Sequence, residues 1–446
     1  MLKNAIRVAS DQKVIVSGAS RVGIANARWP FLPATSKVLG GHALHFISTL
    51  FDNSTPTSSD VDELSDYLVL ASCCHTLDGW RYLSQAAITF LNGSKRNALH
   101  YAYYAELRAA LSILAGSGIC IAHDKHYAIS SGNRIEWFRG STHDITWLAL
   151  QRWAKQPIQA AKVIDCFTAY DITAREWGEA CRNTLSLNDI ASNWLSNWSI
   201  DLSQLSIDRN LRNDVSYNPD LGNDSFAPIT RHDIEFIRDL SDSFNLKRSG
   251  SFESLDNVII YDLLNKICLS RYSDVTRINQ ALLSRDIIHW LTTNKRMNAR
   301  EVAEILRSLN ICSSMPASKV IKYSDLSHRD VYGVICRASL LLRLSTALNR
   351  NLWEKIRRIS AGGNSPWQLE ILQLYGLCTN LWDANNVPAT NSDFVDIEED
   401  RITAQDVIDQ WLEDNSVFSH YKIWDEKSQY LIAMCRFERT GILALT

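Results

Sequence analysis

The stretch DVDELSDYLVLASCCHTLDGWRYLSQAAITFL (60–91) and the stretch RNALHYAYYAELRAALSILA (96–115) that follows it decide the fold class of this chain. Both place apolar residues at steps of three and four, which is the spacing of one face of an α-helix. Asn92, Gly93 and Ser94 separate the two stretches, and glycine readily adopts the left-handed conformation that ends a helix. Two successive helices are therefore predicted.

The composition of the whole chain also favours helices. Only 18 glycines and 9 prolines occur in 446 residues, which is about half the combined average for these two residue types. So few helix breakers argue against a β-rich or disordered chain. The formal net charge of −3 excludes a strongly basic nucleic-acid coat, but it leaves room for a local basic patch.

One region departs from the helical period. GICIAHDKHYAIS (118–130) and RIEWFR (134–139) alternate in the manner of strands, and a Ser-Gly-Asn turn sequence (131–133) stands between them. A small β-hairpin near 118–139 is therefore predicted as an insertion between helices.

The best candidate for a domain boundary is the stretch from Tyr217-Asn218-Pro219-Asp220 to residue 231. It contains the helix breakers Gly222 and Pro228. We predict a mainly α protein in three parts. These are an irregular N-terminal segment over 1–60, a helical bundle with the hairpin insertion over 61–225, and a second helical domain over 226–446.

The cysteines and apolar runs indicate a reduced, cytoplasmic protein. Ten cysteines are scattered without a CxxC pair, so we expect buried thiols rather than a disulfide framework. The N-terminus has no apolar core followed by a small-residue cleavage site, and we expect no signal peptide. The longest nearly uncharged apolar stretch, 109–122, is too short to span a membrane.

Two short motifs partly match a cofactor-binding or a metal-binding sequence, but their residue spacing does not fit either kind of site. VSGASRVG (16–23) is similar to a dinucleotide-binding loop, yet Val22 and Ile24 occupy the positions of the later glycines. Cys120, His123 and His126 suggest zinc, but no second cysteine pair completes a four-ligand site. We expect a solvated hairpin turn at the two histidines, and no cofactor or metal.

HYAYYAELRAALSILAGSGI (100–119) resembles the opening helix of HEPN-like helical domains, and DRNLRNDVSYNPD (208–220) resembles their late helix. The resemblance covers about a third of the chain and implies a helical bundle, commonly dimeric, that binds RNA. Active members use an arginine shortly before a histidine, in a reaction that needs no metal. A cation holds the scissile phosphate, and an imidazole transfers protons near neutral pH.

The catalytic match within this resemblance is incomplete. Arg209 and Arg212 fit the arginine positions, but Ser216 and Tyr217 stand where the histidine is expected. Elsewhere Arg96 and His100 lie four apart at the start of the HEPN-like helix, with one residue too few between them. The candidate catalytic residues are Arg96, His100, Arg209 and Tyr217, with Arg212 as a nucleic-acid contact. Whether the protein is a metal-independent ribonuclease or a degenerate one is left open.

A basic segment lies in the C-terminal region. Residues 337–358 carry six basic groups against the single acid Glu354, and Arg343, Arg350 and Arg357 recur every seven residues. Arginines on one helix face can hold phosphates without recognising a sequence, so these three are candidate nucleic-acid contacts. The alternative is a solvated or salt-bridged face.

A second polar set lies within the helices at 60–91 and 96–115. Charges embedded in apolar helices usually pair with each other, since an unpartnered buried charge is costly. We expect Glu106 to pair with Arg81 or Arg108.

Two functions of different classes remain at this point. The first, from the resemblance, is a nucleic-acid-associated protein of the bacterial defence or toxin–antitoxin type. Its HEPN-like part binds RNA or DNA, or it mediates contact with a protein partner or with a second copy of the chain. No association with a membrane is expected. The second is a non-catalytic subunit of a larger protein assembly, which packs tryptophans against its partners: Trp194, Trp198, Trp367 and Trp411.

Overall fold

The structure is a computed structural model of the 446-residue chain. It describes residues 47, 57–122, 125–130, 134–181, 189–191, 194, 228–246, 252–325, 330–359, 391–415 and 417–445. The predicted sites at Arg209, Arg212 and Tyr217 lie outside these residues, and so do most of the predicted segment 1–60 and the tryptophans 198 and 367.

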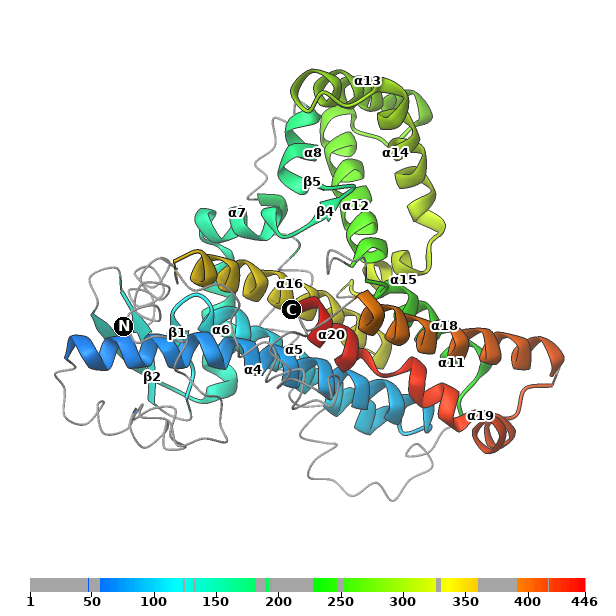
Figure 1. Cartoon of the computed structure of the whole chain (residues 1–446), viewed down its shortest axis with the longest axis horizontal. Coiled ribbons are helices and arrows are strands. Elements are labelled where there is room, and N and C mark those ends of the chain that lie inside the picture. Colours follow the sequence, from blue (N-terminus) through cyan, green and yellow to red (C-terminus); the bar gives the residue numbers. More distant parts are fainter. Residues whose placement is uncertain are drawn as a thin grey trace.

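Two long helices form the base of the molecule (Figure 1). They are α4 (Ser58–Leu91) and α5 (Lys95–Ala115), which pack against each other along their lengths. Thr57 and Asp60 form a reciprocal capping box that fixes the start of α4. Gly93 has a positive φ of 85° in the connection between the helices, as the Asn-Gly-Ser sequence predicts.

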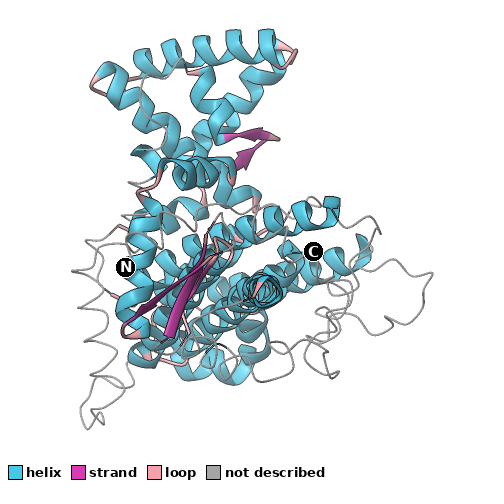
Figure 2. Ribbon diagram, turned by 90° about the vertical axis from the view of Figure 1, so that its left-hand side faces the viewer, coloured by secondary structure: helices cyan, strands magenta, loops and turns pink. Residues whose placement is uncertain are grey.

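A small antiparallel sheet follows α5. Its strands are β1 (Ile119–Cys120), β2 (Lys125–Ile129) and β3 (Ile135–Arg139), and β2 lies in the middle. The predicted hairpin is therefore confirmed and gains one short strand. Figure 2 shows this sheet beside the basal helices, whereas the two-stranded sheet of β4 (Thr168–Ala169) and β5 (Ile172–Thr173) lies in the upper group of helices.

Shorter helices build an upper group above the base (Figure 1). Pro157 occupies the first turn of α7, where its missing N–H is not needed, and Thr173 with Glu176 caps α8. The helices of this part are α7 (Pro157–Asp165), α8 (Ala174–Ala180), α12 (Glu253–Tyr272), α13 (Arg277–Asn294), α14 (Ala299–Ile311) and α15 (Pro316–Tyr323), with a short 3-10 turn at Cys312–Ser314. By contrast, α6 (Thr142–Ala154) and α11 (Arg231–Ser243) lie at the base, where α6 packs on α5 and α11 contacts α4.

The helix α16 (Val331–Ile359) connects the two groups and packs against α4 and α5. Over Val331–Lys355 it is long and apolar enough to cross a membrane, but 89% of its most apolar window is buried inside the protein. It therefore has the character of a core helix. The chain continues with α18 (Asn391–Asp414), α19 (His420–Met434) and α20 (Phe437–Leu445), and α20 returns to pack against α4 and α16.

Very close packing joins α16 to the basal helices. A Cβ atom added at Gly79 of α4 would lie 2.5 Å from Leu342 Cδ2, so an alanine here would require the Leu342 side chain to shift. Nearby, buried Asn349 Nδ2 donates to Thr76 Oγ1 over 2.9 Å and to Ser112 Oγ over 2.8 Å. These bonds satisfy polar groups that would otherwise be costly to bury.

The mainly α fold class is confirmed. The principal core cluster contains residues of both predicted helical segments, from Trp80 on α4 to Leu341 on α16 and Phe437 on α20. The nine described cysteines are all free thiols, and eight of them are buried, as predicted.

Candidate functional site

The predicted pair Arg96 and His100 lies on α5, and His100 borders an aromatic surface. Three tyrosines form this surface, which we call the tyrosine face: Tyr82 of α4, and Tyr101 and Tyr104 of α5. Each is partly exposed. The ring of Tyr82 stacks on Tyr104 at 5.5 Å and on Tyr101 at 6.4 Å, both at an interplanar angle of 29°.

Histidine rings extend the tyrosine face. The His100 ring lies 4.9 Å from the Tyr104 ring. The buried Tyr103 lies beneath, where its hydroxyl is 3.0 Å from His143 Nδ1. Tyrosines that recur at positions 101 and 104 of one helix and meet a tyrosine of the neighbouring helix thus make a continuous aromatic patch.

A cation borders the same face. Arg108 Nη1 donates to His75 Nδ1 over 2.9 Å and lies 3.7 Å from Asp78 Oδ2. Burial is the main cause, and the Arg108 guanidinium a second one, of a His75 pKa lowered to about 3. The imidazole is therefore neutral at physiological pH and accepts the hydrogen bond, which holds Arg108 in place along the two helices.

Glu106 does form an ion pair, as expected, but its partner is Arg337 rather than Arg81 or Arg108. Glu106 is fully buried and lies 3.5 Å from Arg337 Nε of α16, which is also buried. Arg337 follows Glu106 by 231 residues (337 − 106). The spacing of residues within one helix therefore could not predict this pair. Arg108 is turned instead toward His75 and Asp78.

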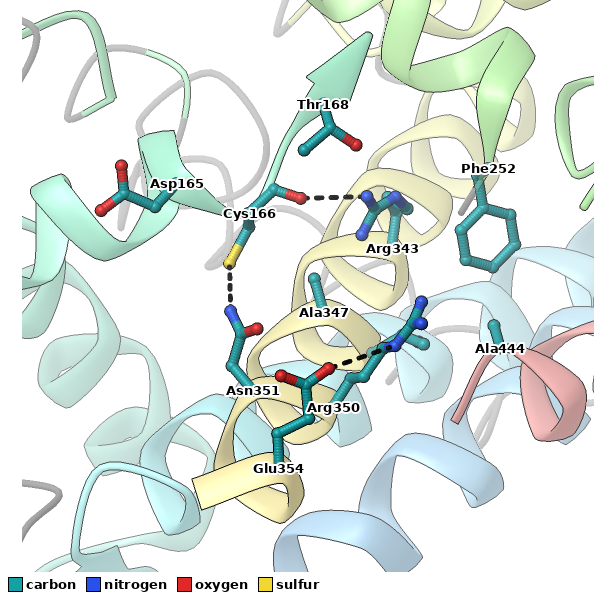
Figure 3. Close-up of a pocket in the computed structure, with 11 residues that line it drawn as sticks. Asp165, Cys166, Thr168, Phe252, Arg343, Ala347, Arg350, Asn351, Glu354 and Ala444 are labelled. Atoms are coloured by element: carbon teal, nitrogen blue, oxygen red, sulfur yellow. Dashed lines mark hydrogen bonds and ion pairs between the residues drawn. The ribbon is translucent and has the colours of Figure 1, made fainter. Parts of the chain in front are cut away.

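A second candidate site is a cavity of about 160 Å³ beside α16. Figure 3 shows its lining, which comes from the end of α7, from β4, from the start of α12, from α16 and from α20. Two of the predicted phosphate contacts, Arg343 and Arg350, line it. Their spacing of seven residues brings both to this side of the helix.

The two arginines lie in different environments. Arg343 is buried, and it donates from Nε and Nη2 to the two carboxylate oxygens of Asp256 over 2.8 and 2.6 Å. Arg350 is partly exposed and lies 3.9 Å from Glu354 Oε1, one turn further along α16. Arg343 is therefore placed inside the protein rather than on an exposed basic stripe, and the side chain of Arg357 lies outside the described residues.

The remaining polar lining of the cavity comes from Asp165, Cys166, Thr168, Thr346 and Asn351. Asn351 Nδ2 lies 3.9 Å from Cys166 Sγ. Burial raises the pKa of the Cys166 thiol to about 12, so this sulfur is neutral at physiological pH. The sequence pattern identified both arginines of the cavity but neither Asp256 nor Cys166, because these residues belong to other helices.

The predicted solvated turn at the two histidines is wrong for His126. It lies in β2, fully buried. Its Nδ1 accepts from the Ala122 N–H over 3.2 Å, and its Nε2 lies 2.9 Å from the Gly140 carbonyl oxygen. The ring therefore ties two loops of the sheet. Among the described residues, no group of three or more potential ligands is arranged to hold a metal ion.

Two of the tryptophans assigned to partner contacts are used within the chain. Trp194 and Trp411 are buried. Trp194 Nε1 donates to Asp262 over 2.9 Å, and Trp411 Nε1 donates to Glu426 over 2.7 Å. Both side chains are thus satisfied without another protein.

Comparisons with known proteins found no relative. No protein-family model matches the chain, and no curated protein or solved structure is significantly similar to it. Function therefore has to be argued from the chemistry of the two sites.

Proposed function

We propose that this protein binds single-stranded RNA on the tyrosine face of α4 and α5. The observation that carries the proposal is the stacked arrangement of Tyr82 with Tyr104 and Tyr101, at ring separations of 5.5 and 6.4 Å. Partly exposed aromatic rings offer stacking surfaces to unpaired bases, and stacking of this kind contributes about 1–3 kcal/mol per base.

Positive charge along the same face supports this proposal. Arg108 borders the tyrosines on α5, and its side chain is 30% exposed. Arg96 lies three turns earlier on the same helix, beside His100. Arginines that flank stacking rings can bind the phosphates that connect the bases. The arrangement favours RNA held by stacking and charge, without recognition of a particular sequence.

The wider hypothesis, of a HEPN-like RNA-associated protein in bacterial defence or a toxin–antitoxin pair, rests on the resemblance described above. Within it, Arg96 and His100 are the groups that would act on a bound phosphate. Cleavage is a separate outcome from binding, and incubation of the bound RNA followed by gel analysis reports it directly.

Binding to a fluorescently labelled 12-nucleotide RNA, followed by anisotropy, tests the proposal. Tyr104→Ala is expected to weaken binding about fivefold to a hundredfold, the loss of one stacked base. Tyr104→Phe keeps the ring and should bind within about twofold of the unchanged protein. Tyr421, which is 80% exposed on α19, supplies the matched control, and Tyr421→Ala should have no effect.

Salt and competitor experiments complete the test. Affinity should fall as the salt concentration rises, because phosphate contacts release counterions, and unlabelled single-stranded RNA should compete better than duplex RNA. Equal affinities for Tyr104→Ala and Tyr421→Ala would refute the proposal. If the tyrosine face instead mediates self-association, Tyr104→Ala will change the sedimentation coefficient and leave RNA binding unchanged.

A further inference from the structure

The helix α13 at the top of the molecule has an exposed basic surface. Arg277 and Arg285 are exposed on this helix, and the exposed Arg296 follows two residues after its end. We call these three arginines the basic face. Within the described ranges their side chains make no ion pair and no hydrogen bond. The one carboxylate of α13, Asp286, is buried and pairs with Arg271 at 2.8 Å, so it does not neutralise the basic face.

An acidic surface of similar character lies on α18. Glu399, Asp406 and Glu413 are exposed and recur every seven residues, so they share one side of this helix. We call these three residues the acidic face. Their side chains also form no ion pair or hydrogen bond with any other residue that the structure describes. The one basic residue of α18, Arg401, is buried and pairs with Asp242 at 3.0 Å.

Each of the two faces includes an exposed isoleucine. Ile278 follows Arg277 on α13 and is 74% exposed, and Ile402 lies between Glu399 and Asp406 on α18 and is 43% exposed. An apolar side chain surrounded by charged ones has the composition of a small protein–protein contact, in which a polar rim encloses an apolar centre.

The charges beside the basic face are paired or balanced. Asp274, just before α13, accepts a hydrogen bond from Asn279 Nδ2, and Glu176 of α8 pairs with Lys295. The neighbouring helix α14 has two exposed charges of each sign, and two of them lie 3.2 Å apart: Arg300 with Glu304, and in addition Arg307 and Glu301. The surplus of positive charge therefore belongs to the basic face itself.

The surroundings of the acidic face are balanced in the same way. Asp400, on another side of α18, lies 3.6 Å from Arg439 Nη1. The adjacent helix α19 has two charged residues of each sign: Lys422, Lys427, Asp425 and Glu426. The negative surplus is thus a property of the three residues of the acidic face.

The two faces match each other in length but lie on different parts of one molecule. Figure 1 shows α13 at the top of the upper group and α18 beside the base. Arg277 and Arg285 are eight residues apart, and Asp406 and Glu413 are seven apart, which corresponds to about 12 and about 10 Å along a helix. Opposite charges on two such helices can therefore face one another when the helices belong to different molecules.

We propose that the basic face of α13 binds the acidic face of α18 on a second copy of this chain. Opposite charges bring the two surfaces together and orient them, and Ile278 and Ile402 supply the apolar contact. A two-fold pair makes this contact twice, so that both faces of both copies are occupied. Neither face includes a residue of the tyrosine face, so RNA binding and self-association are separate properties.

Sedimentation velocity of the full chain tests the proposal. The unchanged protein should self-associate at about 50 mM salt and dissociate at about 500 mM, because salt screens exposed charges. Arg285→Glu and Asp406→Arg, each at the centre of its face, should separately weaken association about tenfold or more. An equimolar mixture of the two variants should associate again, because each altered face then meets a face of opposite sign.

Charge reversals on the hairpin are the matched controls. Arg134 and Glu136 are exposed at β3, and Arg134→Glu and Glu136→Arg should leave self-association unchanged. Tyr104→Ala, on the tyrosine face, should also leave it unchanged.

The apolar contact has a test of its own. Ile278→Ser should weaken association about threefold to tenfold. Ile158→Ser, at a site on α7 that is 55% exposed, should have no effect.

Four outcomes would overturn the proposal. The first is that the unchanged protein sediments as a single copy at every salt concentration. The second is that Arg285→Glu and Asp406→Arg behave like the hairpin controls. The third is that their mixture associates no better than either variant alone. The fourth is that Arg285→Glu weakens RNA binding and leaves self-association unchanged, which would make the basic face a nucleic-acid contact. Circular dichroism should verify that each variant folds, since all the altered side chains are partly or fully exposed.

Discussion

Arg343 of α16 and Asp256 of α12 form a buried, two-armed ion pair, with distances of 2.8 Å from Nε to Oδ1 and 2.6 Å from Nη2 to Oδ2. Burial raises the pKa of the Asp256 carboxyl, and the Arg343 guanidinium opposes that rise. The pair joins the upper helices to the helix that packs on the base. It also sets the direction of the guanidinium that faces the cavity.

Removing one partner of this pair should destabilise the whole fold. Asp256→Asn leaves Arg343 buried without a counter-charge, and we expect a loss of about 3–5 kcal/mol in the free energy of unfolding. Urea denaturation followed by circular dichroism measures it. Glu304→Gln, which breaks an exposed pair, should cost less than about 1 kcal/mol. Similar costs for the two variants would contradict the structural role assigned to the buried pair.

A methyl group added at Gly79 should lower the stability of the protein. Alanine ordinarily stabilises a helix relative to glycine by about 1 kcal/mol. Here its Cβ would meet Leu342 Cδ2 at 2.5 Å, and Leu342 is fully buried. We therefore expect Gly79→Ala to destabilise the protein by about 1–3 kcal/mol.

Thermal and urea unfolding of a double-mutant cycle separates these two effects of Gly79→Ala. In a Leu342→Ala background the clash is absent, so Gly79→Ala should there be neutral or stabilising. An equal loss in both backgrounds would show that packing against Leu342 is not the cause.

Asn349 should contribute more to the stability of the fold than Asn351, which lies two residues later on the same helix. Its amide donates to Thr76 and Ser112, and Ser72 Oγ lies 2.8 Å from Asn349 Oδ1. Asn349→Ala leaves several buried hydroxyls with fewer partners, at a cost of about 1–3 kcal/mol. Asn351→Ala loses only a long contact to sulfur and should cost under about 1 kcal/mol. Guanidinium denaturation checks the order, and a reversed order would be evidence against the network.

The stability of the protein should depend on His75 in the acid range. Its pKa is about 3 in the folded protein and about 6.5 in an unfolded chain. Between these values the unfolded state binds more protons, so stability falls as the pH is lowered through that window and is retained above it.

Replacing His75 measures how much of the loss of stability at low pH is due to this residue. His75→Gln should reduce the loss of unfolding free energy between pH 7 and pH 4, as determined by urea titrations at each pH. His289→Gln, on the exposed part of α13, is the control. If both variants lose stability as steeply as the unchanged protein, His75 does not carry the effect.

The helices and the hairpin could be predicted from the spacing of apolar residues along the sequence. Helical spacing over 60–91 and 96–115 corresponds to α4 and α5, because the periodicity of apolar residues reports which side of a helix is buried. Alternation over 118–139 predicted the hairpin for the same kind of reason. The short strand β1 was not separated from it, since two residues are too few to give a period.

The candidate sites were accessible only in part. Arg96 and His100 were selected by their spacing, but Tyr82, which completes the tyrosine face, lies on the preceding helix. Arg343 and Arg350 were selected as an exposed stripe, whereas Arg343 is buried. Seven-residue spacing places two side chains on the same side of a helix but does not say whether solvent or another helix lies there.

By itself, the sequence determined that this is a helical protein with a small β insertion, because helix breakers are rare and each element has its own period. It also determined which residues share a side of each helix. Only the tertiary structure decided the partners: Arg343 with Asp256, Glu106 with Arg337, and Tyr82 with Tyr104. Each contact joins two different helices, and the energy of a buried charge depends on such neighbours rather than on local spacing.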